Sequence, residues 1–430
     1  MPNPIRENLL PLMNNKLLYR LDWWAILCYL LLISFGLVNI YSNAYNGDPV
    51  PLFNTSNIVG KQLIFFIICL ILLLPTLYLN PILFEHLAFT IFTISVVLLL
   101  GLFLFGTKIS GATSWYNLGG IRFQPSEFTK ISVSLLIAYV LSGIDAHLKR
   151  TQTLIKFWGI ILLPMVLIVA QPDPGSALVF LGLVFVLIRE GGNFGFILIG
   201  FYALFLFLLT IVINPINTSL IVGFLFFIFL YFFGTRRAKR KRVWPYFILL
   251  FLSVGFSFTV NFIFNEVFQQ RHRDRINLVL GLVEDNQGIG YNINQSKIAI
   301  GSGAFTGKGF LEGSQTKGGF VPEQHTDFIF STVGEEWGFI GSFGLVLLYT
   351  LFIARILFRA EKHTHTFSRI VSYSFASILF VHFGVNIGMT LGLVPTIGIP
   401  LPLISYGGSS LLAFSLFFFI YLNLDANRLR

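Results

Sequence analysis

Polar and charged residues that could do chemistry gather in a few short segments of this otherwise apolar chain. The first segment holds Arg122, Gln124, Glu127 and Lys130. Pro125 marks a helix start there, because proline is tolerated in the first turn of a helix. Lys130 then lies near Glu127 by the i, i+3 spacing. A helix N-terminus flanked by Arg122 and Lys130 could bind an anion such as pyrophosphate, and the alternative is a Glu–Lys pair with a purely structural role.

Three further segments carry the same kinds of residue. Asp173 stands between two prolines at the junction of two apolar runs, where it could be functional or simply cap the second helix. His325 and Asp327 could bind a metal ion, but no third ligand follows at a clear spacing. The small residues of 400–409, around Ser405, suit close packing between helices, so we expect most of that segment to be structural.

The segment 266–336 differs from the rest of the chain because it is rich in charge. Its charged and titratable residues include Arg271, Arg273, Asp274, Arg275, Glu284, Asp285, Lys297, Lys308, Glu312, Lys317, Glu323, His325, Asp327, Glu335 and Glu336. A solvated loop would explain them, but apolar residues are threaded among them, at 298–300, 305, 320–321 and 328–330. Irregular backbone at membrane depth must be covered by protein or by a wet cavity. We therefore expect these apolar residues to pack on the outer ends of the helices.

The composition indicates which elements hold these segments. Apolar residues make up 55% of the 430 residues, charged residues only 11%, and the mean hydropathy is +0.79. Soluble globular chains carry about 25% charged residues, because their surface must be hydrated. The composition therefore excludes a soluble enzyme, a disordered chain and a coiled coil. Cys28 and Cys69 lie inside apolar runs, so we expect neither a disulfide framework nor a cysteine metal site.

Runs of roughly 17–25 apolar residues can cross a membrane as helices. Twelve such runs are present, at 22–42, 60–79, 82–105, 126–144, 156–171, 174–189, 194–213, 217–234, 243–265, 337–358, 369–391 and 404–424. We therefore predict an all-α polytopic integral membrane protein, with residues 1–430 forming a single membrane domain of about twelve transmembrane helices.

The distribution of lysine and arginine orients these helices, since cytoplasmic loops are enriched in both. With a cytoplasmic N-terminus, 19 of the 29 basic residues fall on one side, including the cluster in the basic loop 235–242. The net charge of +10 thus reflects positive-inside loops and not binding to nucleic acid. We predict that both termini are cytoplasmic and that 266–336 is a large periplasmic loop before the tenth span.

In this order and on this predicted side, the motifs resemble those of the SEDS family (shape, elongation, division and sporulation) of polytopic peptidoglycan glycosyltransferases. The matching segments are QPSEFTK (124–130), QPDPGSALV (171–179), GIGYNINQSKIAIGSG (288–303), GKG (307–309), FVPEQHTDFIFSTVGEEWGFIG (320–341) and PLPLISYGGSS (400–410). They are more similar to the elongation type, RodA, than to the division type, FtsW. The family usually has ten spans, and two of the predicted spans within 194–265 are additional to that number.

The resemblance implies an enzyme of the bacterial cytoplasmic membrane that polymerises lipid II, a disaccharide-pentapeptide on undecaprenyl pyrophosphate. Glycan strands would form at the outer face during cell elongation and rod-shape maintenance. The essential aspartate of the family maps to Asp285, which would be the general base, with Glu284 as the competing carboxylate. The usual proline after that aspartate is Asn286 here. Arg122 and Lys130, with or without a divalent cation (Mg or Mn), would stabilise the pyrophosphate leaving group.

The resemblance also implies further substrate-binding residues and several partners. The remaining candidates in the matching motifs are Gln124, Glu127, Asp173, Gln295, Ser296, Lys308, Glu323, His325, Asp327 and Ser405. The expected partners are a class B penicillin-binding protein, which is a transpeptidase, other elongation-complex proteins, lipid II and undecaprenyl pyrophosphate. No cofactor other than the divalent cation is expected.

Two other functions compete with this one. Broken spans and buried charges would also suit a lipid II flippase, which should expose functional charges to both leaflets in turn. Here the charges that topology does not explain gather on the predicted outer side, which favours chemistry at that face. A scaffold for the cell-wall machinery would tolerate changes to its outer carboxylates.

Overall fold

The protein is a helical membrane protein, as the composition predicts. The computed structural model describes residues 19–109, 111–119, 121–143, 150–234, 244–283 and 288–428. Ten helices in these ranges are long and apolar enough to cross a membrane. They are α3 (Trp23–Ala44), α4 (Ile58–Tyr78), α5 (Pro81–Phe105), α7 (Thr151–Ala170), α10 (Gly195–Ile213), α11 (Pro215–Phe229, continued by η2, Leu230–Gly234), α13 (Trp244–Phe262, continued by η4, Ile263–Val267), α17 (Ile329–Ala360), α18 (Thr366–Thr390) and α19 (Gly408–Ala426).

The two other predicted spans are helical as well. One is α6 (Pro125–Ser142), and the other is the series α8 (Pro174–Leu178), η1 (Val179–Leu183) and α9 (Val184–Arg189). α6 carries a glutamate and a lysine within its first two turns and is almost wholly buried among other helices. A helix with these charges needs protein around it. The number of twelve spans and the orientation of the termini stay predictions.

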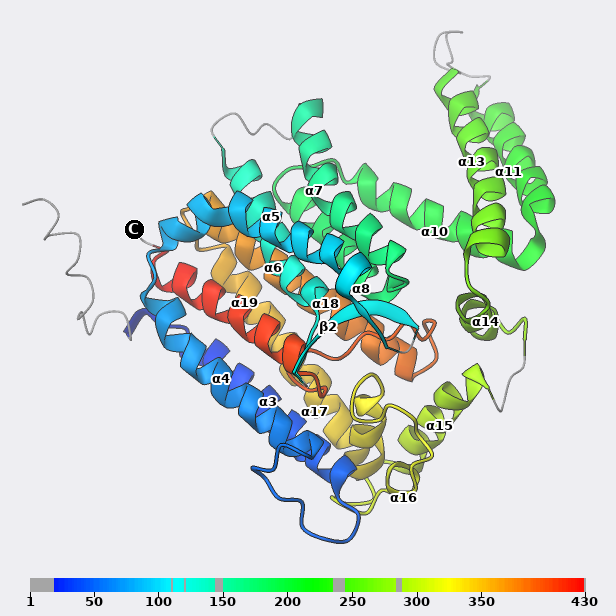
Figure 1. The fold of residues 1–430 in the computed structure, drawn as a ribbon. Coiled ribbons are helices and arrows are strands. Elements are labelled where there is room, and N and C mark those ends of the chain that lie inside the picture. The colour runs from blue at the N-terminus through cyan, green and yellow to red at the C-terminus, as the bar shows by residue number, and fades with distance from the viewer. Residues whose placement is uncertain are drawn as a thin grey trace, which may run out of the picture. The chain divides into compact units, whose positions relative to one another are not determined.

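The chain divides into two compact units, whereas the sequence predicts a single membrane domain. Unit 1 comprises residues 1–192 and 292–430, and unit 2 comprises residues 193–291. In unit 1, α18 contacts α6, α17 and α19, and α19 also contacts α4. These central helices and the flanking α3, α5 and α7 can be followed in Figure 1.

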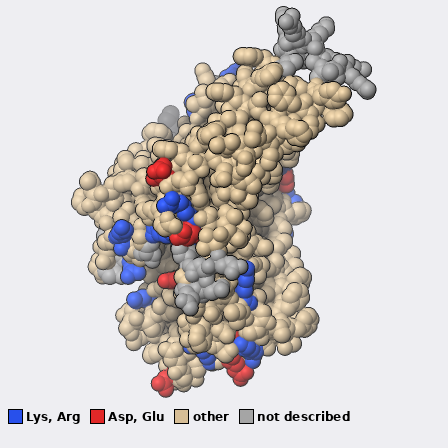
Figure 2. Space-filling view, turned by 90° about the vertical axis from the view of Figure 1, so that its right-hand side faces the viewer, with Lys and Arg blue, Asp and Glu red and all other residues tan. Residues whose placement is uncertain are grey.

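Unit 2 is a bundle of α10, α11 and α13 followed by the short helix α14 (Gln270–Val279). The segment 195–232 contains no Asp, Glu, Lys or Arg. Large apolar side chains such as Phe201, Leu204, Phe227 and Phe251 are exposed on these helices. In Figure 2 most of the visible surface is likewise neither basic nor acidic. Such a surface suits contact with lipid, because lipid tails are as apolar as these side chains. The basic loop 235–242 lies outside the described residues.

A small antiparallel sheet, which the sequence did not predict, precedes α6. It consists of β1 (Thr107–Ile109), β2 (Ala112–Leu118) and β3 (Ile121–Phe123), in the order β1-β2-β3. β2 and β3 pair in the register Tyr116↔Phe123 and Asn117↔Arg122. Strands this short produce too few alternations to be recognised from sequence. Because β3 leads directly into α6, the sheet fixes Arg122 at the start of that helix.

The segment 266–336 is largely helical. It contains α14, α15 (Ile289–Ser302), α16 (Ser314–Lys317) and the first turns of α17. Gly338 interrupts α17 with a φ of 61°, a conformation that favours glycine, so the predicted span beginning at 337 is the part of α17 after this break.

The expectation that the apolar residues of this segment pack is confirmed only in part. Ala299, Val321 and Phe328 form a buried cluster. Phe320, Ile298 and Phe305 are exposed, at 47%, 49% and 64%, so for them the expectation was wrong. The reason for Ile298 is that a short amphipathic helix such as α15 buries only one of its faces.

Ion pairs join the ends of three helices in unit 1. Arg355 Nε on α17 lies 2.9 Å from Oδ2 of Asp22, the residue that caps α3. Asp425 on α19 accepts hydrogen bonds from Arg359 and pairs with His363 Nε2 at 3.2 Å. Arg355 and Arg359 belong to the basic residues that the sequence places on the cytoplasmic side, and the structure gathers them at one end of the bundle.

Candidate active site

The core of the candidate site is a buried cluster of charge on α6. Lys130 Nζ lies 2.7 Å from Glu127 Oε1 and 2.9 Å from His382 Nε2 on α18, and all three side chains are buried. An ammonium group can only donate, so His382 Nε2 accepts and its Nδ1 carries the proton. Nδ1 then donates to the carbonyl of Pro400 at 3.1 Å. His382 therefore links the α6 pair to the segment that precedes α19.

This geometry realises the Glu–Lys pair that the sequence analysis gave as the alternative to an anion site. The i, i+3 spacing correctly predicted this pair. The carboxylate of Glu127 neutralises the ammonium of Lys130. Arg122, by contrast, is exposed at the end of the sheet. The described structure thus brings Arg122 to the surface as a cationic side chain, while Lys130 is enclosed.

The segment 398–409 is the hub that brings the distant motifs together. Ser409 Oγ donates to the carbonyl of Arg122 at 2.9 Å and accepts from the backbone N–H of Gln124 at 3.2 Å. Ser405 Oγ donates to the carbonyl of Thr326 at 2.7 Å. The backbone N–H of Tyr406 donates to the carbonyl of His325, the residue before Thr326, at 2.8 Å. The hydrogen bonds of this segment join the motifs and so assemble the candidate site, and substrate binding by Ser405 stays a prediction.

A hydrogen bond joins the side chains of Gln124 and Asp173, which come from two different motifs. Gln124 Nε2 donates to Asp173 Oδ2 at 3.3 Å. Asp173 also accepts from the backbone N–H of Ser176 at 3.1 Å and from its hydroxyl at 2.8 Å, so it caps α8. The capping role that the sequence left open is therefore present, together with a contact to the first motif.

The segment that contains His325 and Asp327 packs against the same hub. Asn386 on α18 donates to the carbonyls of Asp327 at 2.9 Å and Ile399 at 2.7 Å. The rings of His325 and Tyr406 are 5.8 Å apart. Burial raises the pKa of the Tyr406 hydroxyl, and the positive charge of Arg122 opposes that shift. Arg122, His325 and Tyr406 thus border one polar region at the end of the bundle.

One other predicted site residue, Lys308, belongs to a second cluster, around Glu335. The buried carboxylate of Glu335 lies 2.6 Å from Lys308 Nζ and accepts from the backbone N–H groups of Gln315 and Thr316, both at 2.8 Å. A carboxylate held by this many donors is satisfied structurally. Lys308 thus stabilises the fold of the segment before α17, and its role in substrate binding stays a prediction.

Two further predicted residues make local hydrogen bonds, and a third is placed only by its burial. Ser296 is buried and donates to the carbonyl of Thr390 at 2.9 Å. Glu323 accepts from the Thr326 hydroxyl at 2.9 Å. Gln295 is half-buried on α15.

The predicted base Asp285 and its competitor Glu284 lie outside the described residues. In the described ranges, no three or more His, Cys, Asp or Glu side chains come together as a metal site would require.

Sequence reasoning missed His382 and Asn386. They stand four residues apart in an apolar span, so they share one face of α18. Polar side chains inside a span are functional or structural hubs by default, and this spacing was the signal that could have found them.

Comparisons with known proteins agree with the motifs. The profile of a family described as "Cell cycle protein" (FtsW, RodA and SpoVE) matches residues 22–200 and 192–429. The peptidoglycan glycosyltransferase MrdB of Escherichia coli is 34% identical, over 84% of this chain and 83% of the relative. The peptidoglycan glycosyltransferase RodA of Treponema pallidum is 32% identical, over 91% of this chain and 94% of the relative.

Solved structures have the same fold. A chain from a study of how a peptidoglycan synthase complex coordinates polymerization and crosslinking is 26% identical, with a TM-score of 0.69 over 95% of this chain and 98% of that chain. The rod shape determining protein RodA of Thermus thermophilus has a TM-score of 0.60 at 24% identity, covering 95% of this chain and 98% of its own. With the family profile matching nearly its whole length, the chain belongs to the FtsW, RodA and SpoVE family of cell cycle proteins, which is the SEDS family.

Proposed function

We propose that this chain is a peptidoglycan glycosyltransferase of the elongation type, which polymerises lipid II at the outer face of the cytoplasmic membrane. The names of its relatives support the activity. The observation that carries the proposal is the convergence of the motifs of Arg122, Asp173, His325 and Ser405 on one hub. These segments are far apart in sequence, and the convergence of their polar groups at one end of an apolar bundle supports a shared task.

In the proposed reaction, the carboxylate of Asp285 takes the proton from the attacking sugar hydroxyl. The hydroxyl oxygen forms a bond to the anomeric carbon while the bond from that carbon to the pyrophosphate oxygen breaks. Undecaprenyl pyrophosphate leaves with the electron pair. A single displacement of this kind inverts the anomeric centre and needs no second carboxylate as nucleophile.

We assign the two basic residues of the α6 motif to different tasks. The exposed guanidinium of Arg122 contacts the leaving pyrophosphate, for which its planar fork is suited. Lys130 is a positioning residue, because its ammonium already binds Glu127 and His382. No step is assigned to a divalent cation. Polymerisation of lipid II measured with and without EDTA tests whether such a cation is required.

The partner in this proposal is a class B penicillin-binding protein that crosslinks the new strand. The structural neighbour from a peptidoglycan synthase complex supports this choice. Other elongation-complex proteins would bind the same assembly. Co-purification with the cognate penicillin-binding protein tests the pairing. If that protein is absent when this chain is tagged and purified, the pairing is contradicted.

The decisive experiment is polymerisation of labelled lipid II by the purified protein with its cognate penicillin-binding protein. We expect glycan ladders from the wild type and none from Asp285→Ala, with Glu284→Ala as the matched control that keeps activity. Activity in Asp285→Ala and its loss in Glu284→Ala would move the base to Glu284. No ladders from the wild type, together with transfer of lipid II across vesicles, would establish a flippase instead.

A further inference from the structure

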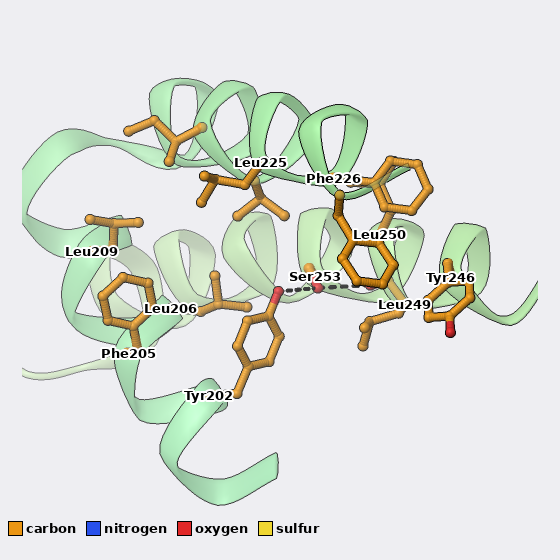
Figure 3. A pocket seen from close by; sticks show the side chains of 13 residues that line it. Tyr202, Phe205, Leu206, Leu209, Leu225, Phe226, Tyr246, Leu249, Leu250 and Ser253 are labelled. Atoms are coloured by element: carbon orange, nitrogen blue, oxygen red, sulfur yellow. Dashed lines mark hydrogen bonds between the residues drawn. The ribbon is translucent and has the colours of Figure 1, made fainter. Parts of the chain in front are cut away.

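Unit 2 contains an apolar pocket among its three long helices. The pocket has a volume of about 360 Å³ and is lined by residues of α10, α11 and α13. Figure 3 shows Phe205, Leu206 and Leu209 of α10 facing Leu225 of α11 and Leu250 of α13 across it. A pocket of this size falls within the range of about 300–1,000 Å³ that is typical of ligand sites.

Three side-chain hydroxyls line this pocket, those of Tyr202, Tyr246 and Ser253, and two of them are already hydrogen-bonded. The hydroxyls of Tyr202 and Ser253 are 2.9 Å apart, and Ser253 also donates to the carbonyl of Leu249 at 2.7 Å. Water gains little in such a space, since it needs two to four polar partners. An α-helix is about 10–12 Å wide with its side chains, too thick to enter the pocket. The occupant that fits is a hydrocarbon chain.

A second cavity, of about 220 Å³, lies in the same unit and has the opposite chemistry. Asparagines dominate its lining, which comprises Thr210, Ile211, Asn214, Asn261, Phe264, Asn265 and Asn277. Asn265 Nδ2 donates to Asn261 Oδ1 at 2.9 Å. Within the described residues the four amides make no other side-chain hydrogen bond, so donors and acceptors remain available. None of the lining residues is charged.

Uncharged amides that both donate and accept suit a ligand rich in hydroxyl or acetamido groups. A phosphate would call for Lys or Arg in the lining. Arg273 is near, but its guanidinium binds the carbonyl of Asn265 at 2.8 Å and the side chain of Gln270 at 2.7 Å, and it is not part of the lining. The small volume limits the ligand in this cavity to about one sugar ring.

The two cavities follow one another along the helices. On α10, Leu209 lines the apolar pocket and Thr210 lines the polar cavity. On α13, Ser253 and Asn261 are eight residues apart, which is about 12 Å along a helix. The polar cavity lies where α10 ends, α11 begins and α13 ends, and all three positions are predicted to face the outer side.

We propose that unit 2 binds an uncharged glycolipid, with its hydrocarbon chain in the apolar pocket and one sugar ring in the asparagine cavity. The proposal does not rest on the proposed catalytic reaction. The lipid in question carries its sugar without an adjacent phosphate, because the cavity lining offers no cation. Lipid II and ordinary phospholipids are the alternatives that an experiment must distinguish.

The test uses the full-length protein in nanodiscs and two photoreactive lipids with the same diazirine-labelled acyl chain. One is a monoglucosyl diacylglycerol and the other a phosphatidylglycerol. After illumination, mass spectrometry locates the adducts on peptides. We expect the glucolipid to label 202–209 and 246–253 about tenfold more than the phospholipid does, since a net gain of one to two hydrogen bonds gives about this factor.

Variants separate the two parts of the site. Leu250→Trp fills the apolar pocket and should abolish this labelling, whereas Leu204→Trp, at a lipid-exposed position of α10, should leave it unchanged. Asn261→Leu and Asn277→Leu should each bring the glucolipid down to the level of the phospholipid. Size-exclusion chromatography and circular dichroism identify any variant that fails to fold. If one asparagine variant does not fold, the other still tests the polar cavity.

Three results would overturn the proposal. The first is equal labelling by the two probes in the wild type. The second is a preference for the glucolipid that survives in folded Asn261→Leu and Asn277→Leu. The third is competition by lipid II but not by unlabelled glucosyl diacylglycerol, which would assign the site to the substrate.

Discussion

Two helices of unit 1 and two of unit 2 have similar lengths but opposite surroundings. In the most apolar stretches of α18 and α19, 67% and 83% of the residues are buried, whereas in α10 and α11 only 11% are. α18 carries His382 and Asn386, and α19 carries Asp425. α10 and α11 carry no charged residue at all. A helix that contains polar groups must be surrounded by protein, while an apolar helix can face lipid.

The comparison explains why the polar contacts of the candidate site lie among the buried helices of unit 1. Lipid tails are as apolar as leucine side chains, so an apolar helix gains little free energy by moving from lipid into the protein. Lipid-facing helices can therefore consist of apolar residues alone. The buried helices are held together instead by packing and by specific hydrogen bonds, such as those of Lys130 and His382. The same bonds assemble the candidate site, so stability and function should be coupled in unit 1.

The largest expected effect tests the buried charges of α6. Lys130→Met leaves the Glu127 carboxylate buried without its partner, and we expect a loss of about 3–5 kcal/mol in the free energy of unfolding. Unfolding in detergent, followed by circular dichroism, measures it. The double variant Glu127→Gln/Lys130→Met should recover most of this loss, and a double variant as unstable as the single one would contradict the explanation.

A matched pair of leucines compares the two units directly. Leu422 of α19 is 1% exposed and Leu204 of α10 is 52% exposed. Leu422→Ala removes packing that nothing replaces and should cost about 2–5 kcal/mol. Leu204→Ala should change stability by less than about 0.5 kcal/mol. Equal effects in the same unfolding assay would break the distinction between the units.

A smaller effect tests the link through His382. His382→Leu leaves Lys130 and the carbonyl of Pro400 without their shared partner, which should cost about 1–3 kcal/mol and lower the rate of lipid II polymerisation. His382→Gln can still accept and donate, so it should retain more activity and stability. If the two variants lose activity equally, His382 does not act through these hydrogen bonds.

The smallest effect concerns an exposed ion pair at the other end of unit 1. Hydrogen bonds from Arg189 lower the pKa of the Glu361 carboxyl. A lowered pKa in the folded state means that the pair stabilises the protein above the unfolded value of about 4.3, and that this contribution is lost as the pH falls through the folded pKa. Both side chains are about half exposed, so the contribution is at most about 1 kcal/mol. Unfolding of Arg189→Ala at pH 7 and pH 3 measures it: the variant should lose more stability at pH 7 than at pH 3, and an equal loss at both values would contradict this origin.

Much of the architecture could be predicted because lipid imposes a strong one-dimensional constraint. A helix that spans lipid needs a long apolar run, and such runs are visible without knowledge of any neighbour. The spacing of Glu127 and Lys130 likewise predicted their contact, since residues three apart on a helix are neighbours. The short sheet before α6 could not be predicted in this way, because its pairing joins strands of only a few residues.

The sequence alone determined the membrane class, the positions of the helices and the motifs that identify the family. Tertiary structure decided which charges are available: it encloses Lys130, leaves Arg122 exposed and commits Lys308 to Glu335. It also decided that His382 and Ser409 join the motifs, and that two cavities form among the helices of unit 2. The physical reason is that apolar runs are a local property, whereas the partner of a polar side chain can come from anywhere in the chain.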